Sequence, residues 1–344
     1  MSHIPETGAV SDETHRPILH LPHRLRRLRR NATVRSLVRE TRLSPNILIY
    51  PLFVCEGQNI RREIPSMPGV FQLSVDEAVK EALAAWEDGV LGLILFGCSG
   101  HRDETGSAAS DPEAPVQAAT RAIKQANPKC LVITDACLCE YTSHGHCGIV
   151  SNEEIVNDAT VSEITRVALS QAESGADIIA PSDMMDGRVR AIRETLDRHK
   201  FEDVAIMSYA AKYCSSLYGP FRDAVDSAPT FGDRRTHQMD PANTNEALRE
   251  VELDIEEGAD IVMVKPALHY LDVIYRVKTE FAHPTAAYHV SGEYSMLKAA
   301  SKNNWVDEPQ VMLECLTAIR RAGADIIITY YAREAARILR QNAV

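Results

Sequence analysis

The sequence of 344 residues contains no uninterrupted apolar run of the roughly 18 residues that a membrane-spanning helix needs. It also lacks an excess of basic residues: the net charge is −11, which does not favour nucleic acid or an anionic membrane as a partner. The first residues carry no apolar signal core, and acidic residues appear early among them. We therefore expect a cytoplasmic protein with neither a membrane nor a nucleic acid among its partners.

Cysteine is too sparse and too unevenly distributed for a disulfide framework. Of the eight cysteines, five are scattered along the chain, whereas Cys137, Cys139 and Cys147 lie close together. In a cytoplasmic protein, clustered cysteines indicate metal binding or catalysis rather than disulfide bonds. Composition leaves room for one large barrel or two modest domains, since 45% of the residues are hydrophobic and 25% are charged.

From residue 46 onward, short apolar runs alternate with helical segments, a pattern typical of a parallel sheet with crossover helices. Eight such units predict a (β/α)8 TIM barrel of the α/β class. A doubly wound open sheet is the runner-up, although the Gly-x-Gly-x-x-Gly dinucleotide fingerprint is absent. The candidate strands are Ile47–Val54, Val90–Phe96, Leu131–Cys137, Ala176–Pro181, Val204–Tyr209, Asp260–Lys265, Ala286–Val290 and Asp325–Tyr330.

Several of these strands follow a Gly-Ala-Asp sequence, which begins at Gly175, Gly258 and Gly323. Glycine at this position is expected to end the preceding helix in a left-handed cap. The apolar run that follows is expected to be buried on both faces of the sheet.

Residues 1–44 are predicted to form an extended N-terminal arm, and residues 45–344 the catalytic barrel. The arm contains a basic stretch from His23 to Arg30. Composition leaves two alternatives open: a solvated arm, or an arm that packs on an acidic face of a neighbouring subunit.

Two lysines follow neighbouring predicted strands, Lys212 just past the fifth and Lys265 at the end of the sixth. Catalytic groups of TIM barrels lie at this end of the strands, and adjacent strands are only about 4.8 Å apart. Two cations beside an apolar core lower each other's pKa, and a neutral amine can form a Schiff base with a ketone. The alternative is that either lysine extends to solvent.

The three clustered cysteines follow the third predicted strand. On an extended segment, Asp135, Cys137 and Cys139 would point the same way, and a glycine-containing loop could return Cys147 to them. Three thiolates with an open fourth position are typical of catalytic zinc. His144 or His146 could instead complete a closed structural site, and three unconnected buried cysteines are the remaining alternative.

A long loop rich in glycine, proline and arginine follows Lys212, and insertions of this kind are commonly functional. Arg222 and Arg234 lie in it and could hold a carboxylate through paired hydrogen bonds. Ser291 and Tyr330 follow or end the last two predicted strands and offer hydroxyl groups to a second carboxylate.

Taken together, the segments 135–148, 181–189, 207–223, 263–266, 288–293 and 325–331 resemble the 5-aminolevulinate dehydratase (porphobilinogen synthase) family, and the resemblance runs from about residue 24 to the C-terminus. It implies a hydro-lyase that condenses two 5-aminolevulinates to porphobilinogen in haem biosynthesis. Lys265 would hold the first, P-side substrate as a Schiff base, and Lys212 the second, A-side one.

The resemblance also assigns the remaining site residues. Ser291 and Tyr330 match the P-side carboxylate ligands; Arg222, Arg234 and Gln238 match the A-side ones; Phe96 and Phe221 match aromatic residues beside that pocket; and Asp135 and Ser182 match polar residues near the reacting centre. Cys137, Cys139 and Cys147 match the zinc ligands, and soft thiolates favour Zn2+ over the Mg2+ that other members use.

Two further expectations follow from the family. Glu250 matches a glutamate that binds an allosteric Mg2+, with a solvated helix residue as the alternative. The arm would wrap a partner subunit in a homo-octamer. The chain departs from the family pattern between Cys98 and Ser107, which lacks the expected proline and lysine, and near Asn303, where glycine is common.

Two other functions stay open on the sequence alone. A single Schiff-base lysine would suggest a class I aldolase or a related lyase, with incidental cysteines. A zinc-binding scaffold protein without turnover is the second.

Overall fold

The computed structural model describes residues 21–341, which fall into two compact units divided between Glu40 and Thr41. The first unit contains the 3-10 helix η1 (Leu25–Arg29) and the helix α1 (Ala32–Leu37). Asn31 caps α1, since its side chain accepts a hydrogen bond from the backbone of Val34. The predicted arm and barrel also include residues 1–20 and 342–344, which lie outside the described residues.

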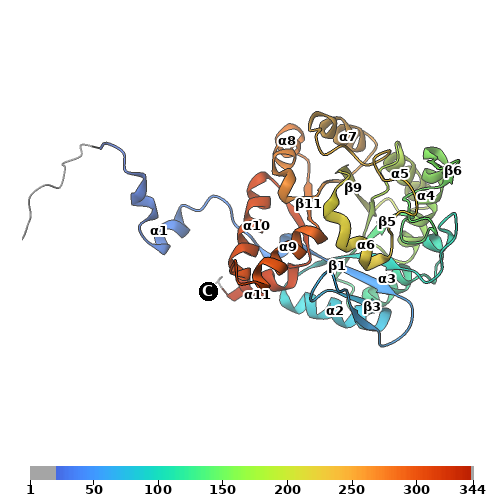
Figure 1. The fold of residues 1–344 in the computed structure, drawn as a ribbon, viewed down its shortest axis with the longest axis horizontal. Helices are drawn as coiled ribbons and strands as arrows, with labels where there is room; N and C mark the ends of the chain where they lie inside the picture. The colour runs from blue at the N-terminus through green and yellow to red at the C-terminus, as the bar shows by residue number, and fades with distance from the viewer. Residues whose placement is uncertain (1–20, 342–344) are drawn as a thin grey trace, which may run out of the picture. The chain divides into compact units, whose positions relative to one another are not determined.

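The second unit is a closed barrel of parallel strands surrounded by helices (Figure 1). Each barrel strand pairs with the next, and the last pairs with the first, with Leu48 opposite Ile327, so the sheet has no open edge within the barrel. The TIM-barrel prediction is therefore confirmed, and the open sheet is wrong. The barrel strands are β1 (Leu48–Cys55), β4 (Gly92–Cys98), β5 (Leu131–Ala136), β8 (Ile178–Pro181), β9 (Ala205–Lys212), β10 (Ile261–Lys265), β11 (Thr285–His289) and β12 (Ile326–Thr329).

Every predicted strand exists, but several predicted ends are wrong. β9 continues to Lys212, which is its last residue rather than a residue beyond it, because the pairing with β10 runs on to Lys265. The predicted third strand ends one residue early, at Ala136, where the chain turns into the loop of the cysteines. The apolar runs therefore predicted where each strand lies, whereas the strand ends depend on pairing with the neighbouring strands.

The Gly-Ala-Asp sequences end helices as predicted, since the three glycines have φ values of 94°, 104° and 125°. Their aspartates add a contact that the sequence did not reveal. Asp177, Asp260 and Asp325 each accept a hydrogen bond from the backbone N–H near the start of a neighbouring strand, at 2.8, 2.8 and 3.1 Å. Each aspartate thereby ties two strands together at the barrel end opposite the strand carboxyl termini.

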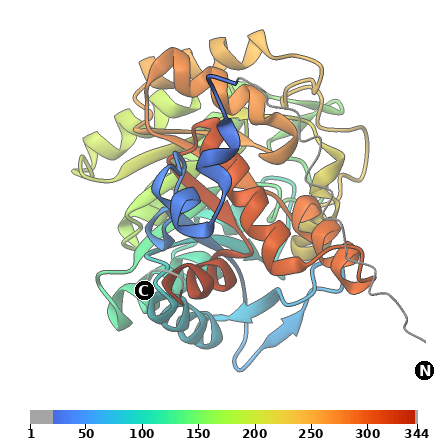
Figure 2. The same cartoon turned by 90° about the vertical axis from the view of Figure 1, so that its left-hand side faces the viewer.

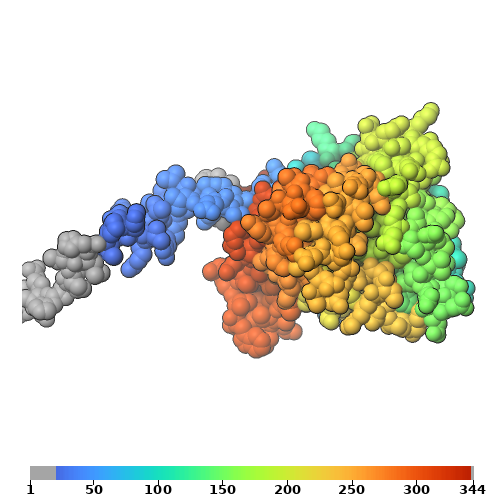
Figure 3. Space-filling model, turned by 90° about the horizontal axis from the view of Figure 1, so that it is seen from above, coloured from blue at the N-terminus to red at the C-terminus, as the bar shows by residue number. Residues whose placement is uncertain are grey.

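Helices pack around the barrel as an outer layer, which Figure 2 shows after a quarter turn. In the space-filling view of Figure 3, the second half of the chain forms a continuous surface in which α7 and α8 lie side by side. The helices are α2 (Val75–Asp88), α3 (Pro115–Ala126), α4 (Asn157–Glu173), α5 (Arg188–Arg198), α6 (Gly219–Val225), α7 (Asn245–Glu256), α8 (Leu271–Phe281), α9 (Ser291–Lys302), α10 (Glu308–Ala322) and α11 (Ala332–Gln341).

At the carboxyl ends of the barrel strands, additional segments are inserted between a strand and the helix that follows it. Between β1 and α2, the short strands β2 (Arg61–Glu63) and β3 (Phe71–Ser74) extend the sheet beside β1. The pair β6 (Val150–Ser151) and β7 (Glu154–Ile155) follows the cysteine loop, and the 3-10 helices η3 (Ser107–Ser110), η4 (Ser216–Tyr218) and η5 (Leu268–Tyr270) follow β4, β9 and β10. The helix α6 belongs to the insertion after β9 and packs against β4 and α9, which places it over the barrel mouth.

Candidate active site

The two predicted lysines lie at the carboxyl ends of neighbouring strands and share one pocket. Lys212 ends β9, Lys265 ends β10, and the two are opposite each other in the strand register. Both side chains are almost fully buried, at 5% and 6% exposure. The pocket has a volume of about 20 Å³ and is lined by Phe96, Asp135, Cys139, Glu140, Ser182, Lys212, Tyr218, Phe221, Arg234 and Lys265.

Lys265 is enclosed by aromatic rings. Its ammonium nitrogen lies 4.4 Å from the ring centroid of Tyr288, 4.8 Å from that of Tyr209, and 5.3 Å from those of Tyr218 and Phe221. These distances are within the range in which a cation is attracted to the face of a ring. The rings therefore favour a positive charge on Lys265, and the charge of Asp135 in the same pocket acts in the same direction.

Burial, and after it the positive charge of Lys212, lower the pKa of Lys265 to about 7. A buried ammonium loses hydration, so the neutral amine is favoured. Near neutral pH, a substantial fraction of Lys265 is therefore a free amine that can attack a carbonyl carbon.

Lys212 has a different environment, because its ammonium group donates a hydrogen bond to the backbone carbonyl of Ser182. The hydroxyl of Ser182 donates to Asp135 at 3.0 Å, and the second carboxylate oxygen of Asp135 has no partner among the described residues. Burial raises the pKa of the Asp135 carboxyl group, while the two lysines oppose that rise. A polar group that can accept or release a proton thus stands beside both amines.

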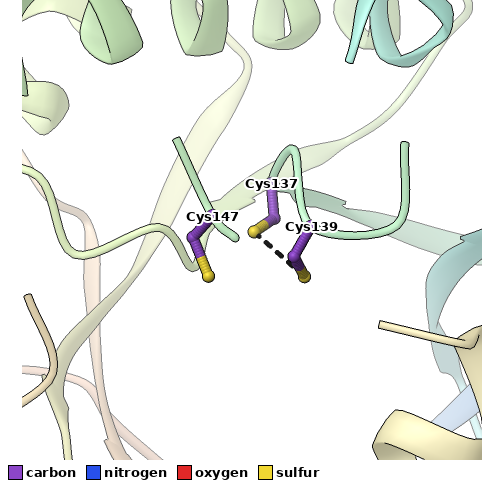
Figure 4. Close-up of side chains that lie close together, drawn as sticks. All are labelled: Cys137, Cys139 and Cys147. Atoms are coloured by element: carbon purple, nitrogen blue, oxygen red, sulfur yellow. Dashed lines mark hydrogen bonds between the residues drawn. The ribbon is translucent and has the colours of Figure 1, made fainter. Parts of the chain in front are cut away.

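The three predicted cysteines come together (Figure 4), and one of them, Cys139, lines the lysine pocket. Their sulfur atoms all lie within 4.8 Å of one another, and those of Cys137 and Cys139 are 3.4 Å apart. The predicted reason for this arrangement was wrong. β5 ends at Ala136, so the sulfurs converge through a turn after the strand rather than along one face of an extended segment.

The electrostatics of this trio favour one thiolate. Hydrogen bonds from Cys137 and Cys139 lower the pKa of Cys147 well below its usual value, and the charge of Arg234 acts in the same direction. Hydrogen bonds with Cys139 and Cys147, together with burial, raise the pKa of Cys137. The hydrogen bond with Cys137 lowers the pKa of Cys139, but the hydrogen bond with Cys147 and burial outweigh it and raise that pKa overall. Three buried sulfurs at this spacing fit a soft cation such as Zn2+.

The neighbouring histidines have other hydrogen-bond partners. The ring of His146 contacts the carbonyl of Phe231 at 2.9 Å, and the ring of His144 contacts the carbonyl of Glu104 at 3.2 Å. Within residues 21–341, the cluster of metal-binding side chains comprises the three cysteines and neither histidine. This arrangement favours the open three-ligand site over the closed one.

The predicted carboxylate clamp contains buried polar atoms without partners. Arg234 is 4% exposed and donates to the carbonyls of Gly145 and Ser227 at 2.8 and 2.7 Å, yet its Nε atom is unpaired within the described chain. The Nε of Arg222 and both amide atoms of Gln238 are also unpaired there. Burial lowers the pKa of Arg222, and the nearby charge of Arg234 adds to this effect. Two close guanidinium groups with free donors are suited to an anion.

Gln238 differs from the two arginines in its position, since it lines a neighbouring cavity of about 290 Å³. Glu250 lines the same cavity from α7, together with Asp186 and Glu246. Burial raises the pKa of Glu250. Within residues 21–341, the group of metal-binding side chains that lie close together comprises the three cysteines and does not include Glu250. The geometry leaves its predicted metal role untested.

The two predicted hydroxyl residues already have protein partners. Ser291, at the start of α9, accepts a hydrogen bond from Phe221 N–H at 3.0 Å and donates to the carbonyl of Leu217 at 3.3 Å. The hydroxyl of Tyr330 lies 3.1 Å from that of Tyr288. The hydroxyl of Ser291 is therefore bonded to the backbone of the segment that covers the pocket, and that of Tyr330 to one of the tyrosines beside Lys265.

Aromatic side chains form the wall between these groups. Phe96 and Phe221 meet edge to face, with centroids 5.1 Å apart. Phe53 packs against both and stacks on Tyr330 at 6.0 Å. The predicted pair Phe96 and Phe221 thus belongs to a larger apolar cluster.

Sequence reasoning missed several residues of the pocket. Tyr209, Tyr218 and Tyr288 surround Lys265, and nothing in the sequence distinguishes them from ordinary core tyrosines. Glu140 is 1% exposed, lines the pocket and has one unpaired carboxylate oxygen within the described chain. Burial raises the pKa of Glu140 well above its usual value. Its position next to Cys139 was the one signal that could have revealed it.

Comparisons with known proteins agree on one family. The family model described as "Delta-aminolevulinic acid dehydratase" matches residues 22–338. Curated proteins of that name are similar: one from Methanothermus sociabilis is 58% identical over 311 residues, covering 90% of this chain and 97% of its own length. One from Bacillus subtilis is 51% identical over 317 residues, covering 92% and 98%.

A solved structure is similar in fold as well. The delta-aminolevulinic acid dehydratase (porphobilinogen synthase) of Toxoplasma gondii ME49, in complex with its reaction product porphobilinogen, matches with a TM-score of 0.91. The two chains are 46% identical, and the match covers 93% of this chain and 92% of that one.

No helix among residues 21–341 is both long and apolar enough to cross a membrane.

Proposed function

Because the chain belongs to the delta-aminolevulinic acid dehydratase family, we propose that it condenses two molecules of 5-aminolevulinate to porphobilinogen with loss of two waters, as a hydro-lyase of haem biosynthesis. The observation that supports this most strongly is the shared pocket: two buried lysines on neighbouring strands open beside three convergent cysteines. A single-lysine aldolase would have no use for the second amine.

Lys265 starts the reaction on the first, P-side substrate. Its neutral amine attacks the ketone carbon, a carbon–nitrogen bond forms, and the ketone oxygen leaves as water to give an iminium ion. The surrounding rings stabilise the positive charge of the iminium, as they do that of the ammonium. The iminium acidifies the neighbouring carbons, which prepares them for bond formation.

Lys212 activates the A-side substrate in the same way. Asp135, Ser182 and Glu140 surround the reacting atoms with groups that can accept and return protons. General acid–base catalysis of this kind typically contributes about 10²- to 10⁴-fold to a rate. One carbon–carbon and one carbon–nitrogen bond then form at the two iminium carbons, and each lysine leaves as a free amine while protons pass to neighbouring groups. The two waters lost overall are those expelled when the two iminium ions formed.

The carboxylates of the two substrates are held by different groups. Arg222, Arg234 and Gln238 bind that of the A-side molecule, an assignment supported by their unpaired polar atoms. Ser291 and Tyr330 bind that of the P-side molecule, and Phe96 and Phe221 exclude water between them. Unlike clamps give two identical molecules different orientations, which is how the condensation becomes asymmetric.

Cys137, Cys139 and Cys147 would hold a Zn2+ ion, and the convergence of their sulfurs supports this assignment. A zinc ion with an open position supplies Lewis-acid chemistry or a bound hydroxide.

Three further proposals concern the whole molecule. The N-terminal arm contacts a partner subunit in a homo-octamer, which the exposed leucines of η1 and α1 support. Glu250 binds an allosteric Mg2+, which its acidic cavity supports. The protein works in the cytoplasm.

Reduction of the enzyme with borohydride in the presence of 5-aminolevulinate, followed by peptide mass mapping, tests the proposed reaction. We expect adducts on Lys265 and Lys212, and loss of one adduct in each of the variants Lys265→Met and Lys212→Met. Lys124, which is paired with Asp177 far from the pocket, serves as the matched control site and should remain unmodified. A single adduct formed only with an aldol substrate would support the aldolase, and the absence of adducts would support the non-enzymatic scaffold.

A further inference from the structure

The cavity between the two lysines is much smaller than its proposed substrates require. Its volume is about 20 Å³, whereas ligand pockets usually measure roughly 300–1,000 Å³. Tyr218, Phe221 and Arg234, which line it from above, all belong to the insertion that follows β9. This insertion, residues 216–238, is called the covering segment below, and it must move away to admit substrates and return for the reaction.

The N-terminal side of α6 is attached to α9. Ser291 accepts a hydrogen bond from Phe221 N–H and donates one to the carbonyl of Leu217. Gly292 lies so close to Leu217 that an added Cβ would be only 2.5 Å from the carbonyl oxygen of that residue. Both hydrogen bonds on this side join uncharged groups, and both are made by Ser291, which is already proposed to bind the P-side carboxylate.

The C-terminal end of α6 is held by a residue with no assigned role, Arg102. Its guanidinium group donates to the carbonyl of Val225 at 2.6 Å and also to the carbonyl of Asp226. The carboxylate of Asp226 lies 3.6 Å from the same group. These are the last carbonyls of a helix, which carry partial negative charge and lack partners within the helix. The side chain of Arg102 is 21% exposed, so these bonds are partly shielded from water.

The loop that carries Arg102 is itself firmly attached to the cysteine loop. The next residue, Asp103, exchanges backbone hydrogen bonds with Tyr141 and Ser143 at 3.2 and 2.8 Å. Its side chain accepts hydrogen bonds from Thr105 and Ser107, which fixes the turn. Arg102 therefore extends from a rigid support to the movable helix.

We propose that Arg102 is a positioning residue that holds α6 closed over the lysine pocket and thereby places Phe221 and Arg222 for the reaction. The expected effect on KM rests on the proposed function, whereas the closure of α6 by Arg102 does not. Arg102 touches no reacting atom; it acts on the site through the backbone of α6.

Trypsin offers a direct measure of closure, because Arg222, Arg234 and Arg235 are cleavage sites within the covering segment. In Arg102→Gln, we expect cleavage at these sites to become at least about tenfold faster, since the open form gains population when charge-assisted hydrogen bonds are lost. The KM for 5-aminolevulinate should rise by roughly the same factor, because a smaller fraction of the enzyme is closed. Arg102→Lys retains the positive charge but has a single nitrogen donor, so its cleavage rate and KM should lie between those of the wild type and Arg102→Gln.

Arg121→Gln is the matched control. Arg121 also donates to a backbone carbonyl, that of Pro112, but it lies on α3 and does not touch α6. Its substitution should leave cleavage of the covering segment and KM unchanged.

The proposal is overturned if Arg102→Gln and the wild type are cleaved at equal rates in the covering segment, or if cleavage rises equally throughout the chain. It is also overturned if cleavage becomes faster there while KM and kcat stay unchanged. Borohydride trapping in Arg102→Gln and in the wild type distinguishes a failure of this proposal from a failure of the proposed reaction. If cleavage of the covering segment becomes faster but neither protein forms adducts on Lys265 and Lys212, the result counts against the proposed reaction and not against closure by Arg102.

Discussion

The charge of Lys212 should control the pH at which Lys265 becomes a nucleophile. In the folded protein the pKa of Lys265 is about 7 instead of 10.5, owing first to burial and then to Lys212. At pH 7 about half of Lys265 would be neutral, whereas an ordinary lysine would be neutral in roughly one molecule in three thousand. Removing the charge of Lys212 leaves the burial but deletes the repulsion.

The size of the change follows from the geometry. The two ammonium nitrogens lie 5.5 and 4.8 Å from the centroid of the same ring, that of Tyr209, so they are at most about 10 Å apart. With an effective dielectric constant of about 20, two charges at that distance repel by about 1.7 kcal/mol, which corresponds to a pKa change of about one unit. The variant Lys212→Met should therefore raise the pKa of Lys265 by about one unit or more.

The assay is the rate of borohydride-trapped adduct formation on Lys265 with 5-aminolevulinate, measured as a function of pH. In Lys212→Met the midpoint should move to higher pH, because a raised pKa keeps the amine protonated for longer as the pH increases. Lys212→Arg keeps the charge and should leave the midpoint in place. An unchanged midpoint in Lys212→Met, or equal shifts in both variants, would contradict the role assigned to the charge of Lys212.

Three other outcomes are expected. Cys147→Ser should reduce the zinc bound per chain, measured by elemental analysis after dialysis, whereas Cys315→Ser, outside the cluster, should not; equal zinc in both would contradict the assigned ligands. Mg2+ should stimulate the wild-type enzyme but not Glu250→Gln, and stimulation of both in steady-state assays would remove the proposed role of Glu250. Phe53→Ala should lower the free energy of unfolding by about 3–5 kcal/mol in urea titrations, because Phe53 is fully buried among three aromatic rings. Leu253→Ala, at a site 54% exposed, should change it by less than about 0.5 kcal/mol, and a similar loss in both variants would contradict the packing argument.

The arrangement of the strands is the part of the fold that local sequence predicted best. Buried parallel strands need continuous apolar runs, and the glycines that end helices need a left-handed conformation, so both leave a visible pattern. The exact strand ends were less predictable. Lys212 belongs to β9 because β10 pairs with it, and that pairing joins residues 53 positions apart in the chain, from Lys212 to Lys265.

The sequence by itself determined the barrel class, and its lysines and cysteines indicated the candidate site, because reactive side chains at strand ends are recognisable without coordinates. The tertiary structure alone decided the environment of those groups. The four rings around Lys265 and the hydrogen bonds of Arg102 to α6 join segments distant in the chain. The turn that brings the thiols together is local, but it depends on where β5 ends. A pKa, a metal site and a closed pocket depend on distances and on exclusion of water, and only the folded chain fixes these.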